Sequence, residues 1–447
     1  MEDVLSQRRF SRSPSLFLLL IFALLILWPF AQAAVKAASP VYLRPDGHDY
    51  ECDGSVDVDY PGGTGPLACA FQTFWKAHQE VDDGGIIYVG AGTYPDVFSI
   101  GKSITVIGAG VDQTIIDRGG DPQGIIISGS TPPTVVISNF TVRNSINVGS
   151  GGGILIVNGT ITLRDCAIEN NTASSGGGIE NWGTLTLERC SIKGNSATGT
   201  FGAGGIYNRG TLVLIDSSVI NNHADTSSAD GGGILNDNDP GEYVRIIRTT
   251  LSGNTADDLG SALKDQGGGP VWLANVTVTG NTIASGDGTI FITAGKTVDV
   301  WHSTIAGNNA GGPGVEGGIV TYSPVILANT MLAGNDNSNC AVFGAGSILP
   351  TGANIDSGST CGFGGGANMP NTDPRLAPLA DNGGYTETMA LLPGSPALEV
   401  GNGLICSMTP VDSVDQRGVA RPIGLGCDIG AYESQYPYSL WLPLIMR

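Results

Sequence analysis

Residues 166–171 read Cys166-Ala167-Ile168-Glu169-Asn170-Asn171, and a phrase of the same kind returns six more times along the chain. In every copy an aliphatic residue stands three positions before an asparagine, and successive asparagines are 24 to 32 residues apart. The seven asparagines are Asn171, Asn195, Asn222, Asn254, Asn281, Asn308 and Asn335. A period of this size indicates a solenoid, in which each repeat buries its apolar face only against its neighbours.

The rest of each repeat follows a pattern as well. After the asparagine comes a glycine-rich stretch that ends in an aliphatic residue, as in Gly176-Gly177-Gly178-Ile179, and then an alternating segment such as Thr184-Leu185-Thr186-Leu187. Alternation with period 2 between turn residues is typical of short strands. Each repeat is therefore predicted to hold three short strands and no helix.

Three strands per coil, stacked coil on coil, form parallel sheets around an apolar core. Because parallel crossovers favour the right hand, we predict an all-β fold, a right-handed parallel β-helix with a short N-terminal capping helix and an irregular C-terminal cap. An asparagine at a tight turn tolerates left-handed backbone angles and bonds the backbone groups that the turn leaves unpaired. We expect the seven asparagines to stack into a buried ladder.

A leucine-rich repeat is the main alternative fold. The spacing Leu187-x-x-Cys190-x-Ile192-x-x-Asn195 satisfies its pattern. That fold needs a helix or a similar convex element after the asparagine, whereas glycines and further strands fill the interval in this chain. The β-helix is therefore favoured.

Two stretches resemble known families. Over residues 135–335, Gly-Gly-aliphatic alternates with aliphatic-x-x-Asn, which resembles the repeats of polymorphic outer-membrane proteins, although those carry Phe before x-x-Asn. Residues 67–117, with Gly92-Thr93-Tyr94 among them, resemble the opening coils of the pectate-lyase-like superfamily. This second resemblance implies the fold and no particular activity.

Residues 1–33 have the features of a secretory signal peptide. Three arginines lie within residues 8–12, an apolar run covers Leu16–Phe30, and Ala31-Gln32-Ala33 is a small-x-small cleavage site. An uncleaved anchor is the alternative, but the run is shorter than the roughly 18 residues of a membrane span. We expect a mature chain that starts at Ala34, has no membrane span, and is secreted or held at the cell surface.

Residues 34–85 are predicted to form an N-terminal region that ends in one helix, Leu67–Val81, and residues 86–340 the β-helix. One face of that helix carries Phe71, Phe74, Trp75 and His78. Because an uncovered end coil would expose sheet edges and core, the helix is expected to cap the solenoid.

In residues 341–435 the period fades and five motifs follow one another. They are Asp373-Pro374-Arg375-Leu376, Asp381–Thr386, Leu392–Ala397, Asp415–Gly418 and Cys427–Glu433. Together they resemble the choice-of-anchor Q domain of secreted bacterial β-helix proteins, which implies a C-terminal closing unit without catalytic residues. Residues 436–447 would form a tail, either a sorting signal or a strand over the last coil.

The eight cysteines fit a disulfide-permissive exterior. Proximity in the sequence suggests the pairs Cys52–Cys69, Cys340–Cys361 and Cys406–Cys427. Cys166 and Cys190 occupy the same position in adjacent repeats, and we expect them to stack as small buried apolar side chains, although this spacing also permits a bond.

The formal net charge is −20 at pH 7. Such a surface repels nucleic acid, and it repels anionic polysaccharide unless Ca²⁺ bridges the two. We expect no nucleic-acid partner and no required cofactor. A candidate for Ca²⁺ binding is the group Asp237, Asp239 and Glu242, because calcium takes several carboxylate oxygens. A polar turn is the favoured interpretation of these residues, with Asn238 as a surface residue.

Few side chains offer catalytic chemistry. Val300-Trp301-His302 resembles a pectate-lyase signature but lacks the Asp between Trp and His, so His302 is expected to be a solvated corner residue. The cations Arg209, Arg245, Arg248 and Lys264 are scattered, and the Gly-His-Gly and Arg-Ile-Lys elements of polygalacturonases are absent from the sequence.

Three aromatic residues, Trp182, Tyr207 and Phe291, each follow a Gly-Gly-Ile type of strand and could line one face that stacks on sugars, with surface scatter as the alternative. The sequence therefore predicts a non-catalytic binding or interaction module for carbohydrate or another surface. The alternative is a polysaccharide lyase or glycoside hydrolase, whose catalytic residues the sequence does not identify. The oligomeric state stays open.

Overall fold

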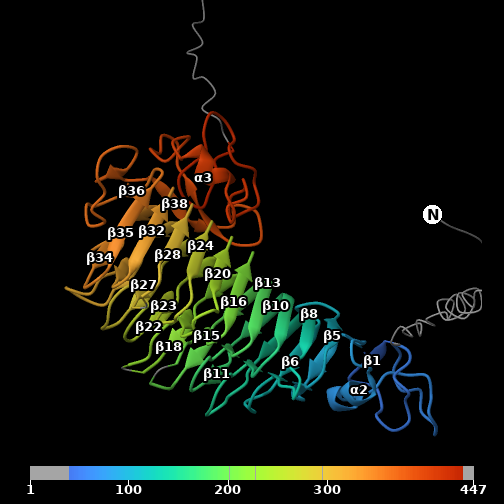
Figure 1. The fold of residues 1–447 in the computed structure, drawn as a ribbon. Helices are drawn as coiled ribbons and strands as arrows, with labels where there is room; N and C mark the ends of the chain where they lie inside the picture. The colour runs from blue at the N-terminus through green and yellow to red at the C-terminus, as the bar shows by residue number, and fades with distance from the viewer. Residues whose placement is uncertain (1–39, 201, 227, 294, 436–447) are drawn as a thin grey trace, which may run out of the picture. The chain divides into compact units, whose positions relative to one another are not determined.

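The computed structural model describes residues 40–435 except positions 201, 227 and 294, so the predicted signal peptide and the C-terminal tail lie outside the described residues. The described chain is a right-handed parallel β-helix, as predicted (Figure 1). Two short helices occur in this part of the chain.

One coil shows how the repeat is built. After the glycines, β12 (Ile179–Asn181) is followed by a tight corner and then by β13 (Thr184–Lys193), which bends at Arg189, where φ is 52°. The chain turns again at Gly194, with φ of 63°, and at the ladder residue Asn195 before the next glycine-rich stretch. The left-handed angle at position 194 favours glycine, and Asn170 takes the same place one coil earlier.

Strands at equivalent places in successive coils stack into three faces. The first face holds β1 (Val41–Leu43), β2 (Ile86–Val89), β5 (Ile104–Gly108), β8 (Thr134–Arg143), β10 (Thr160–Glu169), β13, β16 (Thr211–Ile215), β20 (Val244–Ile247), β24 (Val271–Ala274), β28 (Val298–Trp301), β32 (Pro324–Ala328) and β35 (Ser347–Thr351). The second face holds the C-terminal halves of β8, β10 and β13 with β3 (Gly92–Tyr94), β6 (Thr114–Asp117), β17 (Ser218–Ile220), β21 (Thr250–Ser252), β25 (Thr277–Thr279), β29 (Thr304–Ala306), β33 (Met331–Ala333), β36 (Ile355–Asp356) and β37 (Met369–Pro370).

The third face follows the glycine-rich stretches. It holds β4 (Phe98–Ile100), β7 (Ile125–Ile127), β9 (Ile154–Ile156), β12, β15 (Ile206–Asn208), β19 (Ile234–Asn236), β23 (Leu263–Asp265), β27 (Ile290–Ile292), β31 (Ile319–Thr321) and β34 (Cys340–Val342). Two-residue strands follow the asparagine ladder, namely β11 (Thr172–Ala173), β14 (Ser196–Ala197), β18 (His223–Ala224), β22 (Thr255–Ala256), β26 (Thr282–Ile283) and β30 (Asn309–Ala310).

Like residues stack on like residues in the core. Ile179 pairs in register with Ile206, and Ile206 with Ile234, and all three side chains are fully buried. Burial of this kind stabilises the fold by roughly 1.5–3 kcal/mol for each aliphatic side chain. The apolar column explains why a coil is stable only between neighbours.

The predicted asparagine ladder is confirmed. Asn195 Oδ1 accepts from both the backbone N–H and the Nδ2 of Asn171, each at 3.0 Å. Its Nδ2 donates to the carbonyl of Ile168 at 2.9 Å and to Asn222 Oδ1 at 3.0 Å. The pattern continues to Asn335, which turns to Asn339 Oδ1 at 2.8 Å because the next coil is irregular.

At the N-terminal end the helix is shorter than expected. α2 spans Phe74–Glu80 rather than Leu67–Val81, and Thr73 caps it by accepting from Lys76 N. The preceding residues are bends with two isolated parallel bridges, Leu67 with Cys52 and Phe71 with Leu43. Parallel pairing also starts earlier than residue 86, because β1 pairs with β2.

At the C-terminal end parallel pairing continues past residue 340, through β35, β36 and β37. The chain then runs back beside earlier coils, through the antiparallel pair β38 (Leu376–Ala380) and β39 (Thr388–Leu391) and through α3 (Gly403–Ser407) (Figure 1). Gln416 bridges two coils, since its Nε2 donates to Thr250 Oγ1 at 2.8 Å and its Oε1 accepts from Thr277 Oγ1 at 2.6 Å. The segment thus covers a flank of the solenoid as well as its end.

All eight cysteines are paired, and the three predicted disulfides are confirmed. The expectation of two unbonded cysteines at 166 and 190 is wrong, because these residues form a fourth disulfide across adjacent coils with a Cα–Cα distance of 4.6 Å. In-register stacking of β10 on β13 places the two Cα atoms directly opposite each other.

Across the described ranges, no helix is long and apolar enough to pass through a membrane.

Candidate functional site

The corner between the third and first faces carries most of the exposed aromatic rings of the coils. Its residues come directly after each third-face strand: Val157, Trp182, Arg209, Asp237, Gln266, Thr293, Tyr322 and Phe343. Backbone bonds hold the column in register, for example from Trp182 N to Ile156 O at 2.9 Å and from Arg209 N to Asn181 O at 2.7 Å. The side chains of this column come from successive coils, and they lie next to one another because the coils stack.

Arg209 lies between two aromatic rings. Its guanidinium carbon is 4.4 Å from the ring centroid of Trp182 and 5.8 Å from that of Tyr207. Asp237 fixes this arrangement, since it forms an ion pair with Arg209 at 3.5 Å and accepts from the Tyr207 hydroxyl at 3.2 Å. The Trp182 indole donates to the buried Glu180 at 2.8 Å. The Trp182 ring is thereby held in place while half of its surface stays exposed, at 50%.

Arg245 repeats the arrangement on the first face. Its guanidinium carbon is 5.0 Å from the ring centroid of Tyr243 and 5.1 Å from that of Trp272. Register places Arg245 beside Trp272, and Trp272 beside Asp299. Burial raises the pKa of Asp299, although a hydrogen bond from Trp272 opposes this rise.

Arg245 differs from Arg209 in having no ion pair among the described residues, and its side chain is exposed. We call the six residues that form the two arginine sites the aromatic corner: Trp182, Tyr207, Arg209, Tyr243, Arg245 and Trp272. The sequence prediction named Trp182 and Tyr207 for this role but not Tyr243 or Trp272. Tyr243 stands two residues before Arg245 in the sequence, whereas Trp272 comes beside Arg245 only after the coils are stacked.

Phe291 does not join this surface. It was expected to be exposed, but only 5% of it is accessible. Its outward position in β27 is covered, and its ring packs 6.0 Å from that of Tyr322, which in turn stacks on Phe343 at 5.4 Å. The prediction for Phe291 is therefore wrong.

The candidate calcium ligands have protein partners. Asp237 pairs with Arg209, Glu242 accepts from the Thr211 hydroxyl, and Asp239 is exposed. Asn238 was expected at the surface but is buried at 3% exposure, and its Oδ1 accepts from Asn236 Nδ2 at 3.2 Å and from Gly269 N at 3.2 Å. A role for the three carboxylates in Ca²⁺ binding stays a prediction.

A second amide ladder, which the sequence analysis missed, lines the inside of the third face. Asn181 donates to Asn208, Asn208 to Asn236, and Asn236 to Asp265, at 2.7, 2.8 and 2.8 Å. Burial raises the pKa of Asp265 to about 6, although hydrogen bonds from Asn236 and from the Gly267 backbone oppose this rise. The other carboxylate oxygen of Asp265, Oδ2, has no partner. The repeated pattern Gly-Gly-Ile-x-Asn in the sequence could have predicted this second ladder.

The remaining cations of the sequence analysis are neutralised. Arg248 binds Asp216 through two bonds of 2.6 and 3.0 Å, and Lys264 forms a buried ion pair with Asp230. The hydrogen bond and charge of Asp216 raise the pKa of Arg248. The structure therefore leaves Arg245 as the free cation among the four candidates.

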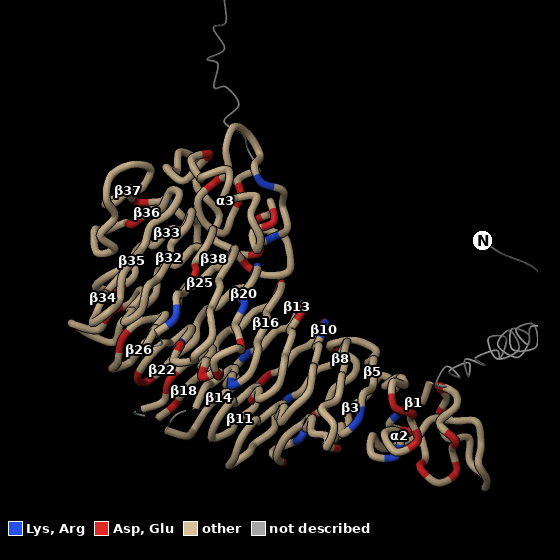
Figure 2. Tube along the Cα trace, viewed as in Figure 1, with Lys and Arg blue, Asp and Glu red and all other residues tan. Residues whose placement is uncertain are grey.

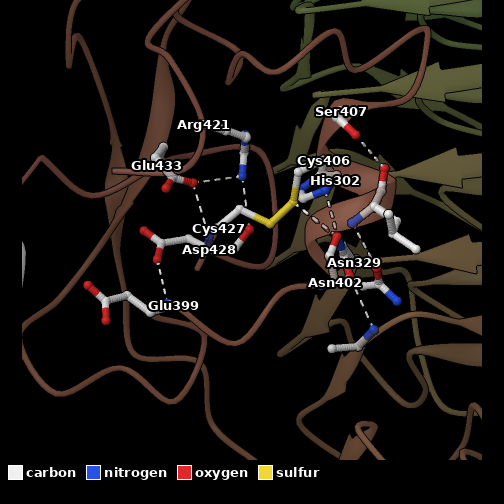
Figure 3. Close-up of a disulfide and its surroundings, with 12 residues drawn as sticks. His302, Asn329, Glu399, Asn402, Cys406, Ser407, Arg421, Cys427, Asp428 and Glu433 are labelled. Carbon is white, nitrogen blue, oxygen red and sulfur yellow. Dashed lines mark hydrogen bonds and ion pairs between the residues drawn. A yellow bond between two sulfur atoms is a disulfide. The ribbon is translucent and has the colours of Figure 1, made fainter. Parts of the chain in front are cut away.

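His302 is not a solvated corner residue, and that expectation is wrong. The C-terminal segment covers it completely, beside the disulfide Cys406–Cys427 (Figure 3). Asn329 donates to its Nε2 at 2.8 Å, while its Nδ1 has no partner. Burial and the charge of Arg421 lower the pKa of His302 well below its usual value, so the imidazole is neutral.

Within the described ranges, one group of three side chains offers metal ligands close together, and it consists of His302 with the two cysteines of that disulfide. Because both sulfurs are bonded to each other, this group is not a metal centre in the oxidised protein.

No family model and no curated protein matches the sequence. Among solved structures, the crystal structure of pectate lyase Pel9A matches with a TM-score of 0.54 and 14% identity, over 88% of this chain and 96% of that chain. ORF18 of Geobacillus virus E2 matches more weakly, with a TM-score of 0.38 and 14% identity, over 62% of this chain and 57% of that chain. The parallel coils and the first of these matches show that the chain has the pectate-lyase-like parallel β-helix fold.

Proposed function

We propose that this protein is an exported, non-catalytic module that binds carbohydrate through the aromatic corner. One observation carries the proposal: the exposed guanidinium of Arg245 lies over two aromatic rings and has no acidic partner. Aromatic faces pack against the apolar faces of sugar rings, and a guanidinium donates several hydrogen bonds in fixed directions. The two arginine sites together offer both kinds of contact.

The layout suits an extended chain molecule. Trp182, Arg209, Arg245 and Trp272 belong to four neighbouring coils. Coils repeat at the strand spacing of about 4.8 Å, so the aromatic corner extends about 14 Å along the solenoid. A polysaccharide lying along this corner would meet rings and guanidinium groups in alternation.

The side chains that could act as a catalytic base argue against a lyase or hydrolase. A catalytic base needs an accessible group with a pKa near the working pH. The paired carboxylate of Asp165 raises the pKa of Arg189, and Asp216 does the same for Arg248, while His302 is inaccessible. Asp165 and Asp216 thus hold Arg189 and Arg248 protonated, which supports binding rather than proton abstraction by these two residues.

Export is proposed on separate grounds. The first 33 residues have the pattern of a signal peptide, and four disulfides are compatible with an oxidising exterior. N-terminal mass spectrometry of the secreted protein should find a chain that starts at Ala34. An intact Met1 on membrane-bound protein would contradict this proposal.

An array of neutral and acidic polysaccharides, probed with the mature protein, tests the binding function. Arg245→Ala and Trp272→Ala should each lower affinity at least about 10-fold, as expected for residues at the centre of a contact. Lys193→Ala removes another exposed cation, on a different face, and should leave binding unchanged. The same polysaccharides are then incubated with the protein, with and without Ca²⁺. Unsaturated or reducing ends that disappear in Arg245→Ala would establish the enzyme alternative instead.

A further inference from the structure

The N-terminal end of the solenoid holds a cavity with a volume of about 510 Å³. Three segments form it, namely the loop after β1, helix α2 and the turn between β3 and β4. The side chains that matter for its chemistry are Asp49, Tyr50, Thr73, Trp75, Lys76 and Asp96. We propose that this cavity is a second binding site, for a neutral sugar ring, independent of the aromatic corner.

Two aromatic rings at this cavity are largely exposed. Trp75 was expected to pack on the solenoid, but 68% of it is exposed, because Phe74 and Ala77 supply the buried face of α2. Tyr50 is 89% exposed. Exposed rings of this size at one cavity mark a contact surface rather than a stabilising feature of the fold.

The cavity also contains polar groups that have hydrogen-bonding capacity to spare. Within the described chain, the Trp75 indole N–H, the Tyr50 hydroxyl and the Asp96 carboxylate have no hydrogen-bond partner. Two donors and one carboxylate beside two rings match the polar rim and apolar faces of a pyranose. A carboxylate accepts from two neighbouring hydroxyls at once.

The walls of the cavity are fixed before any ligand arrives. Asp49 Oδ1 accepts from the backbone N–H groups of Gln72 and Thr73 at 2.8 and 2.9 Å, and its Oδ2 accepts from Thr73 Oγ1 at 2.7 Å. The disulfide Cys52–Cys69 ties the chain two residues after Tyr50 to the segment that precedes α2. A preformed site binds with a smaller loss of conformational entropy.

Charge selects the class of sugar. Asp49 and Asp96 line the cavity, while its one cation, Lys76, is paired with Glu80 at 2.5 Å. Figure 2 shows further acidic positions in the loops around β1 and α2. A uronate or a sulfated sugar would meet net negative charge here, so a neutral sugar is favoured.

The space extends beyond one ring. A second cavity of about 280 Å³ shares Thr73 and Asp96 with the first and continues toward Tyr94 and Thr93. Ligand pockets typically measure about 300–1,000 Å³, so the two cavities together suit a disaccharide. Asp96 would then contact both rings.

Ligand-observed NMR and calorimetry on the mature protein test the proposal. The probes are the methyl glycosides of glucose, galactose, mannose and N-acetylglucosamine, with cellobiose, and galacturonate as the charged control. One or more neutral probes should bind with a dissociation constant on the order of 1 mM, as expected for so small a ligand. Galacturonate should bind at least about 10-fold more weakly, since the site repels its charge.

Variants separate this site from the aromatic corner. Trp75→Ala and Asp96→Asn should each weaken the neutral probe at least about 10-fold, without lowering the thermal unfolding temperature, because both residues are outside the core. Trp182→Ala, at the aromatic corner, should leave this affinity unchanged. If no neutral probe binds at probe concentrations well above 1 mM, the proposal is overturned. A loss of affinity in Trp182→Ala, with none in Trp75→Ala or Asp96→Asn, would instead assign the sugar to the aromatic corner alone.

Discussion

Two amide ladders pass through the same coils and end in different ways. The ladder that begins at Asn171 keeps an amide on every coil through Asn335, so each acceptor receives two donors. The ladder that begins at Asn181 keeps three amides and then meets Asp265, a carboxylate with one unpartnered oxygen. In the continuous ladder the amide groups have hydrogen-bond partners. In the interrupted ladder the buried carboxylate of Asp265 lowers stability by an amount that depends on pH.

Breaking the continuous ladder should have the largest effect on stability. In Asn254→Ala, the N–H and Nδ2 of Asn222 lose their acceptor, and the carbonyl of Val219 loses its donor at 2.9 Å. We expect unfolding free energy to fall by about 3 kcal/mol, since several buried groups are left unpaired. Urea melts measure this loss. Asn309→Ala, next to ladder residue Asn308 but exposed, should change stability by less than about 0.5 kcal/mol. Equal losses in both variants would refute the ladder as a stabilising element.

Completing the interrupted ladder should stabilise the protein by up to about 3 kcal/mol at pH 8. The folded-state pKa of Asp265 is raised to about 6 from 3.8, and each pKa unit corresponds to about 1.4 kcal/mol. The folded state therefore holds this proton more tightly, and stability falls as pH rises from about 4 to about 6. Asp265→Asn removes this dependence.

Urea melts of both proteins at pH 4 and pH 8 measure the gain. The free energy of unfolding of Asp265→Asn should exceed that of the parent only slightly at pH 4. At pH 8 it should exceed the parent's by the whole amount expected above. Parallel pH profiles for the two proteins would show that the carboxyl is not protonated in the way its surroundings imply.

Asn238 supports the interrupted ladder from the side, and its loss should have a smaller effect. Only its Oδ1 is used, by Asn236 Nδ2 and Gly269 N, while its Nδ2 has no partner. Asn238→Ala should cost about 1 kcal/mol, typical of a modest buried hydrogen bond. The neighbouring Asp239→Ala, which is exposed, serves as the control and should melt like the parent. Indistinguishable melts for both variants would mean that Asn238 contributes nothing.

The aromatic corner should show the smallest effect on stability and the clearest effect on binding. Trp182→Ala removes a ring that is 50% exposed, so unfolding free energy should change by less than about 1 kcal/mol. The affinity of this variant for a polysaccharide that the parent protein binds should fall about 10-fold, because Arg209 loses the ring that orients it. Thermal melts and array binding measure both. A large stability loss with unchanged binding would reverse the assignment of the corner to function.

Contacts inside the repeat were predictable because they recur with the chain's own period. The three predicted disulfides close local loops with sequence separations of 17 to 21 and lie outside this period. The ladder Asn171–Asn335 and the alternating strands join residues of one coil with those of its neighbour. A spacing of 24 to 32 residues is therefore enough to find them. Asn181 and Asn208 had the same regularity, but their x-Asn phrase is less distinct than aliphatic-x-x-Asn.

What the sequence by itself determined about this protein is the parallel β-helix, because stacking like on like repeats a local pattern. Tertiary structure decided the rest. His302 and Asn275 became buried because a C-terminal segment more than a hundred residues away covers their corner, as the bond from Asn275 Nδ2 to Val414 O shows, with a separation of 139 residues. Arg245 and Trp272 came together because adjacent coils lie side by side, and Trp75 was left exposed because Phe74 occupies the solenoid end. The burial of His302 and Asn275 follows no local period, since it depends on which distant segment of the chain covers their corner.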